Sequence, residues 1–258
     1  GGGRFPSLKA VPQGGVYQRG SFVESSEYKR LGKAGRMLSL TWELMLADKL
    51  GEFARVIADY GRAARRYETR QFYSKLIGTA GAGTMYDGSD LFSVANANIS
   101  GTTGTPSVPV LDAAMQKMAL QRDRPGDPTA IDEDDREGDE LELEARFWLL
   151  PVAHSTAASQ LLGTAFVPTA ATGAVTDEMK ALNIIRGARL DRESTKRSYL
   201  FSDPSDVAAF EYGYLTTEPG PALIREEGFT VDGVDFKCRF TNYLEFVEHR
   251  GVVRIDPA

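Results

Sequence analysis

The clearest hydrophobic pattern of the chain lies between residues 48 and 77. Large apolar residues recur there at spacings of three and four, with one alanine between them: Leu50, Phe53, Ile57, Tyr60, Ala64 and Tyr67. This spacing places them on one side of a helix. Asp48 is a suitable N-cap and Gly78 a suitable end, so we predict a helix over 48–77. At about 1.5 Å per residue it is a rod of roughly 45 Å, which indicates a structural role before a catalytic one.

The residues before this helix predict an arm and a hairpin. Residues 1–15 separate their few apolar side chains with Gly and Pro, which favours an extended arm. Residues 16–45 mix β-forming and charged residues, and we predict a long β-hairpin with its tip near Leu31–Gly35. The hairpin has too few apolar residues to be stable by itself, so it needs another surface, for which a neighbouring copy of the chain is a candidate.

The middle of the chain predicts a loop-rich region, a short helix and a strand. The helix covers 111–121, and its apolar face consists of Leu111, Ala114, Met115, Met118 and Ala119. The segment 140–151, ELELEARFWLLP, alternates strictly and ends at Pro151. One face of this predicted strand carries Leu141, Leu143, Ala145 and Phe147, and the other carries Glu142, Glu144, Arg146 and Trp148.

The remaining patterns predict one further helix and several strands, so the predicted fold class is α+β. AHSTAASQLLG (153–163) predicts a helix, and KRSYLF (196–201) and FEYGYL (210–215) predict strands. Asp232-Gly233 predicts a hairpin turn with alternating residues on both sides. The last strand is expected within 244–255, and no internal repeat is evident.

Composition narrows the function classes. With 258 residues the chain can bury a sizeable core, and its net charge of −6 argues against a dedicated nucleic-acid binder while allowing loose containment of DNA. The one cysteine, Cys238, excludes an intrachain disulfide, and its place in the alternating VDFKCRF predicts a buried thiol. No apolar run is long enough for a membrane span, and no signal peptide is visible.

The candidate chemistry favours a protein without a catalytic, cofactor or metal site. The acidic run Asp132–Glu140 lacks the spacing of an EF-hand loop, so a surface loop or a subunit contact is favoured over a cation site. His154 and His249 lack a nucleophile elbow. We expect His154 to lie at the start of a helix and His249 to be an exposed residue of the end strand. GTAGAG (78–83) follows a helix rather than a strand, which is the wrong context for a dinucleotide loop.

Five arginines lie along the predicted long helix: Arg55, Arg62, Arg65, Arg66 and Arg70. They could contact DNA phosphates. They could equally pair with Glu52, Asp59 and Glu68 of the same helix, or with the acidic loop of a neighbouring subunit. We favour pairing and subunit contact.

Taken in order, several blocks resemble the major capsid proteins of tailed double-stranded-DNA bacteriophages, with Mu-like major head subunits and prohead protease–capsid fusion relatives most similar. The blocks are LTWELMLADKLGEFARVIADYGRAARRYE (40–68), MYDGSDLFS (85–93), FWLLPVAHSTAASQLL (147–162), EYGYL with GP (211–221), and GFTVDGVDFKCRF with HRG (228–251). They cover most of the chain from Leu40 on. Where the family tends to have an acidic residue and an aromatic before Arg-Gly, this chain has Glu248-His249.

This resemblance implies the Hong Kong 97 fold. We therefore expect five segments: an N-terminal arm (1–15), an E-loop hairpin (16–45), a P-domain (46–100) with the spine helix 48–77, an A-domain (101–225), and a return segment of the P-domain (226–258). In this family an N-terminal scaffolding segment is commonly removed, so Gly1 is expected to be a cleavage end.

The resemblance further implies a non-enzymatic major capsid protein that assembles into an icosahedral shell around double-stranded DNA. The implied partners are copies of itself in hexamers and pentamers, the prohead protease and portal during assembly, loosely held DNA, and a decoration protein. The implied location is the virion capsid, assembled in the host bacterial cytoplasm. An encapsulin-like nanocompartment, a gene-transfer-particle shell and a soluble enzyme are the alternatives.

The residues expected to contact neighbouring subunits come from the hairpin, the long helix and the acidic run. They are Tyr17, Phe22, Val23, Tyr28, Lys29, Arg30, Leu31, Lys33, Arg36, Met37, Leu38, Arg62, Arg66, Asp132, Asp134 and Asp135. Since some relatives of the fold cross-link a hairpin lysine to an asparagine, Lys29 or Lys33 could serve in such a bond.

Overall fold

In the structure, a computed structural model, the chain forms two compact units. Unit 1 comprises Gly1–Glu27, Ile77–Ala209 and Phe246–Ala258, and unit 2 comprises Tyr28–Leu76 and Phe210–Glu245. The described residues are 31–41, 51–78, 85, 90–123, 138–163, 175–192, 197–227 and 233–257, with the backbone of 3–4 and 23–24.

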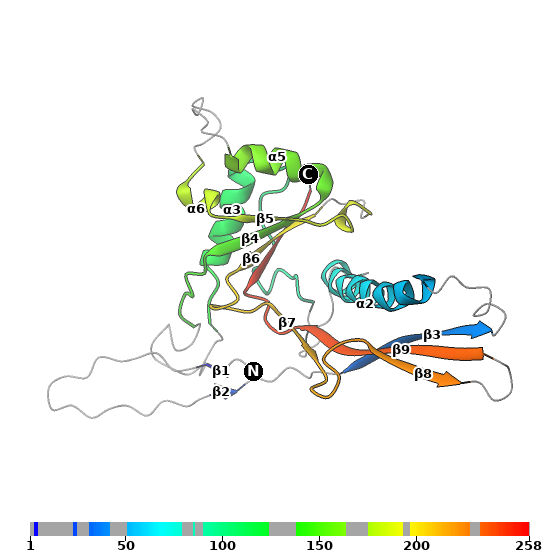
Figure 1. Cartoon of the computed structure of the whole chain (residues 1–258). Helices are drawn as coiled ribbons and strands as arrows, with labels where there is room; N and C mark the ends of the chain where they lie inside the picture. Colours follow the sequence, from blue (N-terminus) through cyan, green and yellow to red (C-terminus); the bar gives the residue numbers. More distant parts are fainter. Residues whose placement is uncertain are drawn as a thin grey trace. The chain divides into compact units, whose positions relative to one another are not determined.

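Unit 1 is built on a four-stranded sheet in the order β10–β6–β4–β5 (Figure 1). Strand β4 (Ala145–Leu150) runs parallel to β5 (Asn183–Arg186) and antiparallel to β6 (Ser198–Ser202). Strand β10 (Val252–Ile255) pairs antiparallel with β6. The parallel pair is connected through helix α5 (Val152–Gly163), because parallel strands need a crossover connection.

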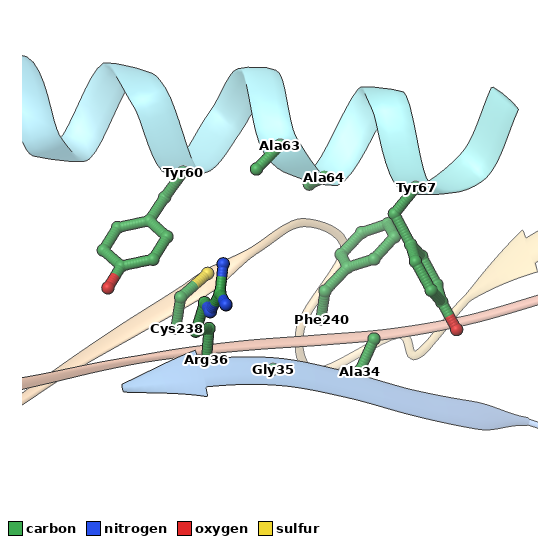
Figure 2. A pocket seen from close by; sticks show the side chains of 9 residues that line it. All are labelled: Ala34, Gly35, Arg36, Tyr60, Ala63, Ala64, Tyr67, Cys238 and Phe240. Carbon is green, nitrogen blue, oxygen red and sulfur yellow. The ribbon is translucent and has the colours of Figure 1, made fainter. Parts of the chain in front are cut away.

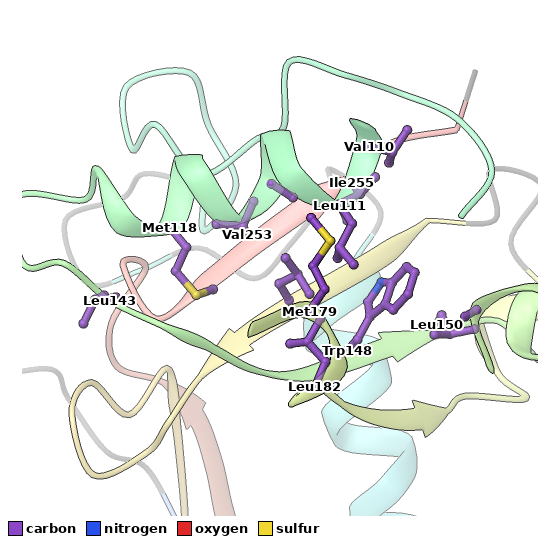
Figure 3. Packing of buried hydrophobic residues seen from close by; sticks show 13 residues of the cluster. Val110, Leu111, Met118, Leu143, Trp148, Leu150, Met179, Leu182, Val253 and Ile255 are labelled. Atoms are coloured by element: carbon purple, nitrogen blue, oxygen red, sulfur yellow. The ribbon is translucent and has the colours of Figure 1, made fainter. Parts of the chain in front are cut away.

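The core of unit 1 lies between this sheet and helix α3 (Val108–Ala119). Trp148, Leu200 and Val253 are partners across three adjacent strands, and each is at most 1% exposed. Figure 3 shows Leu111 and Met118 of α3 among the residues of this cluster. The predicted helix is therefore confirmed with an earlier start, and of its predicted apolar face only Ala119 is exposed.

Helix α5 is also confirmed, and a distant carboxylate caps its start. The backbone N–H groups of Val152 and Ala153 donate to the two carboxylate oxygens of Asp191, at 2.8 and 3.0 Å. Asp191 lies in the short 3-10 helix η1 (Leu190–Arg192), and the described part of unit 1 also contains the short helix α6 (Asp177–Lys180). His154 is the third residue of α5, in agreement with its predicted helix-start position.

The alternation predicted for 140–151 holds only in part. Strand β4 begins at Ala145, and its pairing with β6 shifts register between Ala145 and Phe147. Such an irregularity changes which face each side chain takes. Trp148, which we predicted on the face opposite Phe147, is consequently a central core residue, while Phe147 is only partly buried.

The predicted last strand is two strands separated by a turn. Strand β9 (Gly233–Phe246) ends before His249, and β10 starts at Val252. In the turn, Arg250 is buried and pairs with Asp123 at 2.9 Å and Glu248 at 3.3 Å. His249 is thus a part-buried turn residue 3.4 Å from the Glu248 carboxylate, so its predicted exposed strand position was wrong.

Unit 2 combines helix α2 (Gly51–Ile77) with a four-stranded sheet. Within that sheet β9 pairs with β3 (Gly32–Thr41), β7 (Phe210–Tyr214) and β8 (Ala222–Glu227). Cys238 of β9 has Arg36 of β3 as partner on one side and Leu223 of β8 on the other, so β9 is central there. Helix α2 confirms the predicted rod and ends at Ile77, directly before Gly78, which has a φ of +24°.

The predicted hairpin tip at Leu31–Gly35 was wrong. Gly32 to Thr41 form one continuous strand whose partner is β9, about two hundred residues later in the chain. The short strand β2 (Val23–Glu24) pairs instead with β1 (Gly3–Arg4). The other residues of 1–30, the predicted N-cap Asp48 and the acidic run 131–137 lie outside the described residues.

Strands β7 and β9 agree with the sequence analysis in type, whereas β8 was not predicted. Strand β8 pairs antiparallel with β9, and Glu227 is opposite Val234, while the predicted Asp232-Gly233 turn lies mostly outside the described residues. The predicted mixture of helices and strands, the α+β class, is therefore confirmed. The boundaries of the arm, E-loop, P-domain and A-domain stay predictions.

Because Leu111 belongs to the core of unit 1, we expect Leu111→Ala to destabilise the protein strongly. Leu111 is fully buried, so its truncation should lower the free energy of unfolding by about 2–5 kcal/mol. Leu120→Ala, at the end of the same helix and 67% exposed, should change it by less than about 0.5 kcal/mol. Urea unfolding of the purified subunit measures both, and equal losses would contradict this core.

Candidate inter-subunit contact surface

Strand β3 forms an edge of the unit 2 sheet. It pairs with β9 along its whole length, from Gly32 opposite Asn242 to Thr41 opposite Gly233. Within the described part of the chain, no strand pairs with its other edge. An edge of this kind presents unpaired N–H and C=O groups, which another chain can bind.

Apolar side chains are exposed along this edge. Met37 is 61% exposed, Leu31 47% and Leu38 37%. Single exposed apolar residues are common on soluble proteins. Three of them within eight residues of an unpaired edge strand are instead typical of a surface that a second chain covers.

Helix α2 covers one face of the sheet, and the contact is loosely filled (Figure 2). Tyr60, Ala63 and Tyr67 of the helix lie over Arg36 and Cys238, around a cavity of about 160 Å³. The Tyr67 ring meets Phe240 edge-on at 6.5 Å between centroids. Small side chains on both elements leave this space open, because Ala63 and Ala64 face Ala34 and Gly35.

Burial controls the chemistry of this cavity. It raises the pKa of the Cys238 thiol above its usual value. The thiol therefore stays protonated at neutral pH and behaves as a small apolar side chain. Burial is also the main reason why the pKa of Tyr60 is raised, with the nearby Cys238 as the second cause.

Polar contacts fix α2 to β9 near the end of the helix. The Asn242 side-chain amide donates to Gln71 Oε1 at 2.7 Å, and one turn later Lys75 forms an ion pair with Glu245. Leu76, the next residue, is fully buried. These contacts make the helix and the sheet a single supporting layer for the exposed edge.

A second hollow lies on the outer side of α2. It has a volume of about 410 Å³ and lies between the helix and the turn that follows β7. Its lining includes Arg62, Arg65 and Glu68 of the helix, together with Tyr214. The Tyr214 hydroxyl donates to Glu68 at 2.5 Å, and this bond is the main cause that raises the pKa of Tyr214 to about 12.

The predicted contact residues fall into three groups. Those on or beside the exposed strand are Leu31, Lys33, Arg36, Met37 and Leu38. Arg62 and Arg66 lie on the exposed side of α2, where Arg62 pairs with Asp59 at 3.1 Å and Arg66 donates to the Arg62 carbonyl at 3.3 Å. Val23 is described by its backbone only, and outside the described residues lie Tyr17, Phe22, Tyr28, Lys29, Arg30, Asp132, Asp134 and Asp135.

Arg65 is one of the five helix arginines for which we favoured pairing or subunit contact, but the final list of contact residues left it out, although it lines the outer hollow and Arg66 does not. The helix period could have separated the two, since adjacent residues point about 100° apart. The helix sequence does not show which side of α2 is covered by the turn of residues 219–221.

The described residues hold neither a cluster of metal ligands nor a membrane-spanning helix. Among the described residues, no three His, Cys, Asp or Glu side chains gather as metal ligands would. No helix in the described ranges combines the length and apolar character needed to cross a bilayer.

Comparison with known proteins defines the class. The family described as "Phage capsid protein" matches residues 24–255, and the chain belongs to this family. It is accordingly a major capsid protein, a structural protein of bacteriophage, with the virion capsid as its place. No curated protein matches the chain.

Solved structures show the same fold at low identity. A structure from Mycobacterium phage Adephagia matches with a TM-score of 0.57 at 8% identity, covering 99% of this chain and 81% of the other. The capsid of Myoviridae phage XM1 gives 0.53 at 11% identity, covering 98% and 82%. The holo-SrpI encapsulin complex from Synechococcus elongatus PCC 7942 gives 0.55 at 14% identity, covering 92% and 77%.

The contact between β3 and β9 predicts a strict need for glycine at position 35. A Cβ on Gly35 would lie 2.6 Å from the Cys238 carbonyl oxygen, which is backbone and cannot move freely. We expect Gly35→Ala to lower the free energy of unfolding by about 1–3 kcal/mol.

Gly32→Ala on the same strand is the matched control, since its Cβ would lie 3.6 Å from the nearest atom. It should change stability by less than about 0.5 kcal/mol. Denaturant unfolding of both variants measures the difference, and a neutral Gly35→Ala would show that the two strands are not this close.

The hydrogen bond to Glu68 predicts the titration of Tyr214. Glu68→Gln keeps an acceptor but removes the negative charge, so the pKa of Tyr214 should fall from about 12 toward about 10. Because the folded-state pKa is raised, the stabilisation is complete below the ordinary pKa and is lost as pH rises through about 12.

An ultraviolet difference titration against Tyr214→Phe isolates this hydroxyl from the other tyrosines. Wild-type and Glu68→Gln proteins with the same Tyr214 titration would rule out the bond.

Proposed function

We propose that this chain is a major capsid subunit of the Hong Kong 97 type that assembles into an icosahedral shell enclosing double-stranded DNA. The observation that carries the proposal is the family match over residues 24–255. The similarity to the capsid of Myoviridae phage XM1, at a TM-score of 0.53, and to a structure from Mycobacterium phage Adephagia, at 0.57, supports the fold.

Unit 2 supplies the physical reason for assembly. Its sheet leaves one edge of β3 without a strand partner among the described residues and exposes Met37 beside it. In a shell a neighbouring subunit covers such a surface, and burial of apolar area then contributes about 25 cal/mol per Å² to association. The long helix α2 behind the sheet holds this edge rigid, which suits the proposed role of spine helix.

The proposal includes the segment assignments and partners that the sequence resemblance implies. The five segments are the arm (1–15), the E-loop (16–45), the P-domain (46–100), the A-domain (101–225) and the return segment (226–258). Copies of the chain form hexamers and pentamers in the host cytoplasm, with the prohead protease and portal taking part and a decoration protein as a further partner. The Mu-like and protease-fusion subunits are the proposed nearest relatives.

The interior contact with DNA is proposed to be loose. A net charge of −6 gives no strong overall attraction to phosphate, and weak attraction lets DNA be packed and released. The subunit is proposed to have no catalytic role.

An encapsulin-like shell around protein cargo is the second candidate. The fold similarity to the holo-SrpI encapsulin, with a TM-score of 0.55, favours it as much as it favours a phage shell. The two functions share the architecture and differ in what the shell contains.

Particles purified from the producing host distinguish these functions. We expect closed shells in electron micrographs, an ultraviolet spectrum dominated by nucleic acid, and DNA that is protected from added nuclease. Shells holding protein without nucleic acid would replace the phage function with the encapsulin-like one. A subunit that stays monomeric in size-exclusion chromatography under all assembly conditions would contradict both, and would favour a soluble enzyme.

A further inference from the structure

The cavity between helix α2 and the sheet of unit 2 has the size of one aromatic ring. Its volume is about 160 Å³, and its lining comes from α2, β3 and β9, which all belong to the same unit. In another protein, an apolar cavity of about 150 Å³ binds benzene. The space in unit 2 is therefore large enough for a benzene-sized group.

The walls of this cavity suit such a ring. Tyr60, Tyr67 and Phe240 contribute aromatic side chains, and Cys238 contributes a buried sulfur. Aromatic rings pack favourably against other rings at their edges or faces, and sulfur also packs well against a ring edge. A larger apolar side chain in place of Ala64 would occupy the same space.

Arg36 gives the cavity a positive charge. Among the described residues it is the one charged side chain in the lining, and Figure 2 shows it extending from β3 toward α2, next to Cys238. Its cross-strand partner Cys238 is uncharged, and no carboxylate in the described part of the chain forms an ion pair with Arg36. A guanidinium beside a largely apolar space attracts an anion more strongly than one surrounded by water.

The position of the guanidinium is consistent with its effect on Tyr60. Burial raises the pKa of the Tyr60 hydroxyl, and the positive charge of Arg36 acts in the opposite direction. Arg36 is also exposed, so the cavity has access to solvent beside this charge.

We propose that this cavity binds a small carboxylate whose apolar body is one aromatic ring, such as benzoate. The ring lies between Tyr60, Tyr67 and Phe240, and Arg36 binds the carboxylate through two parallel N–H groups. This binding site goes beyond the proposed shell function and needs no second copy of the chain.

Two other classes of ligand fit less well. A neutral ring leaves the Arg36 guanidinium without a counter-charge. Inorganic phosphate supplies the charge but has no apolar body to contact the aromatic walls. Benzamide, which has nearly the shape of benzoate, and inorganic phosphate are therefore the comparison probes.

Binding to the purified full chain, measured by isothermal titration calorimetry, tests the site. We expect benzoate to bind with a dissociation constant of about 1 mM or below. Benzamide should bind about tenfold more weakly, because a hydrogen bond between two charged groups is stronger than one to a neutral acceptor. Phosphate at the same concentration should not compete with benzoate.

Two variants with matched controls assign the contacts. Arg36→Met should weaken benzoate binding about tenfold and leave benzamide binding within about twofold. Lys33→Met is its control, since Lys33 is an exposed cation of the same strand that does not line the cavity. Ala64→Leu should abolish the binding of both compounds by filling the space. Ala58→Leu should change neither, because Ala58 lines only the outer hollow, whereas Ala64 lines both spaces.

Cys238 reports on the cavity in the unaltered chain, because it is the one cysteine of the sequence and lines the space. Saturating benzoate should slow its modification by methyl methanethiolsulfonate about tenfold, since the bound ring blocks access to the thiol. Saturating benzamide should protect it as well. This measurement decides the question even where a variant does not fold.

Each contrary result overturns the proposal. Absence of benzoate binding up to about 10 mM would show that the cavity is only a gap in the packing. Equal benzoate affinity in Arg36→Met and wild type would exclude Arg36 as the carboxylate partner. Unchanged modification of Cys238 with benzoate bound, or equal losses in Ala58→Leu and Ala64→Leu, would place the ligand elsewhere. None of these results depends on shell formation.

Discussion

The ladder between β3 and β9 is the interaction on which unit 2 depends. It joins residues 32–41 to residues 233–242, so the sheet forms only when the two ends of the sequence meet. The ladder fixes the face of every side chain on β3, and it orders the strand whose other edge has no strand partner in the described ranges. Pairing within the subunit thus creates the surface that a neighbouring subunit is proposed to cover.

Local periodicity explains what could be predicted. The stripe that includes Tyr60 and Tyr67 identified α2, and the pattern around Leu111 identified α3, because a helix is determined by residues three and four apart. The identity of a strand's partner is not local. Residues 31–35 contain two glycines, which favoured a turn, yet Gly35 is a strand residue placed where β9 approaches too closely for a Cβ.

The same limit applies to Trp148 and Arg250. A register shift opposite β6 changes the face of Trp148, and nothing in the alternating sequence shows where such a shift falls. The turn that buries Arg250 is stabilised by Asp123, more than a hundred residues earlier. Within the candidate surface, the exposed apolar residues Leu31, Met37 and Leu38 could be selected from the sequence. The outer hollow could not be predicted from the sequence, since it combines α2 with Tyr214, Phe240 and the turn between β7 and β8.

Hydrogen exchange of β3 in free subunits and in assembled shells tests most directly whether assembly completes this sheet. Peptides covering Gly32–Thr41 report it, since the amides that face β9 are protected in both states and the amides at the other edge are protected only when a neighbour binds. We expect slower exchange in the shell for about half of these amides. Equal exchange in the free subunit and the shell would show that the edge stays uncovered, and would contradict the proposed role of β3 in capsid assembly.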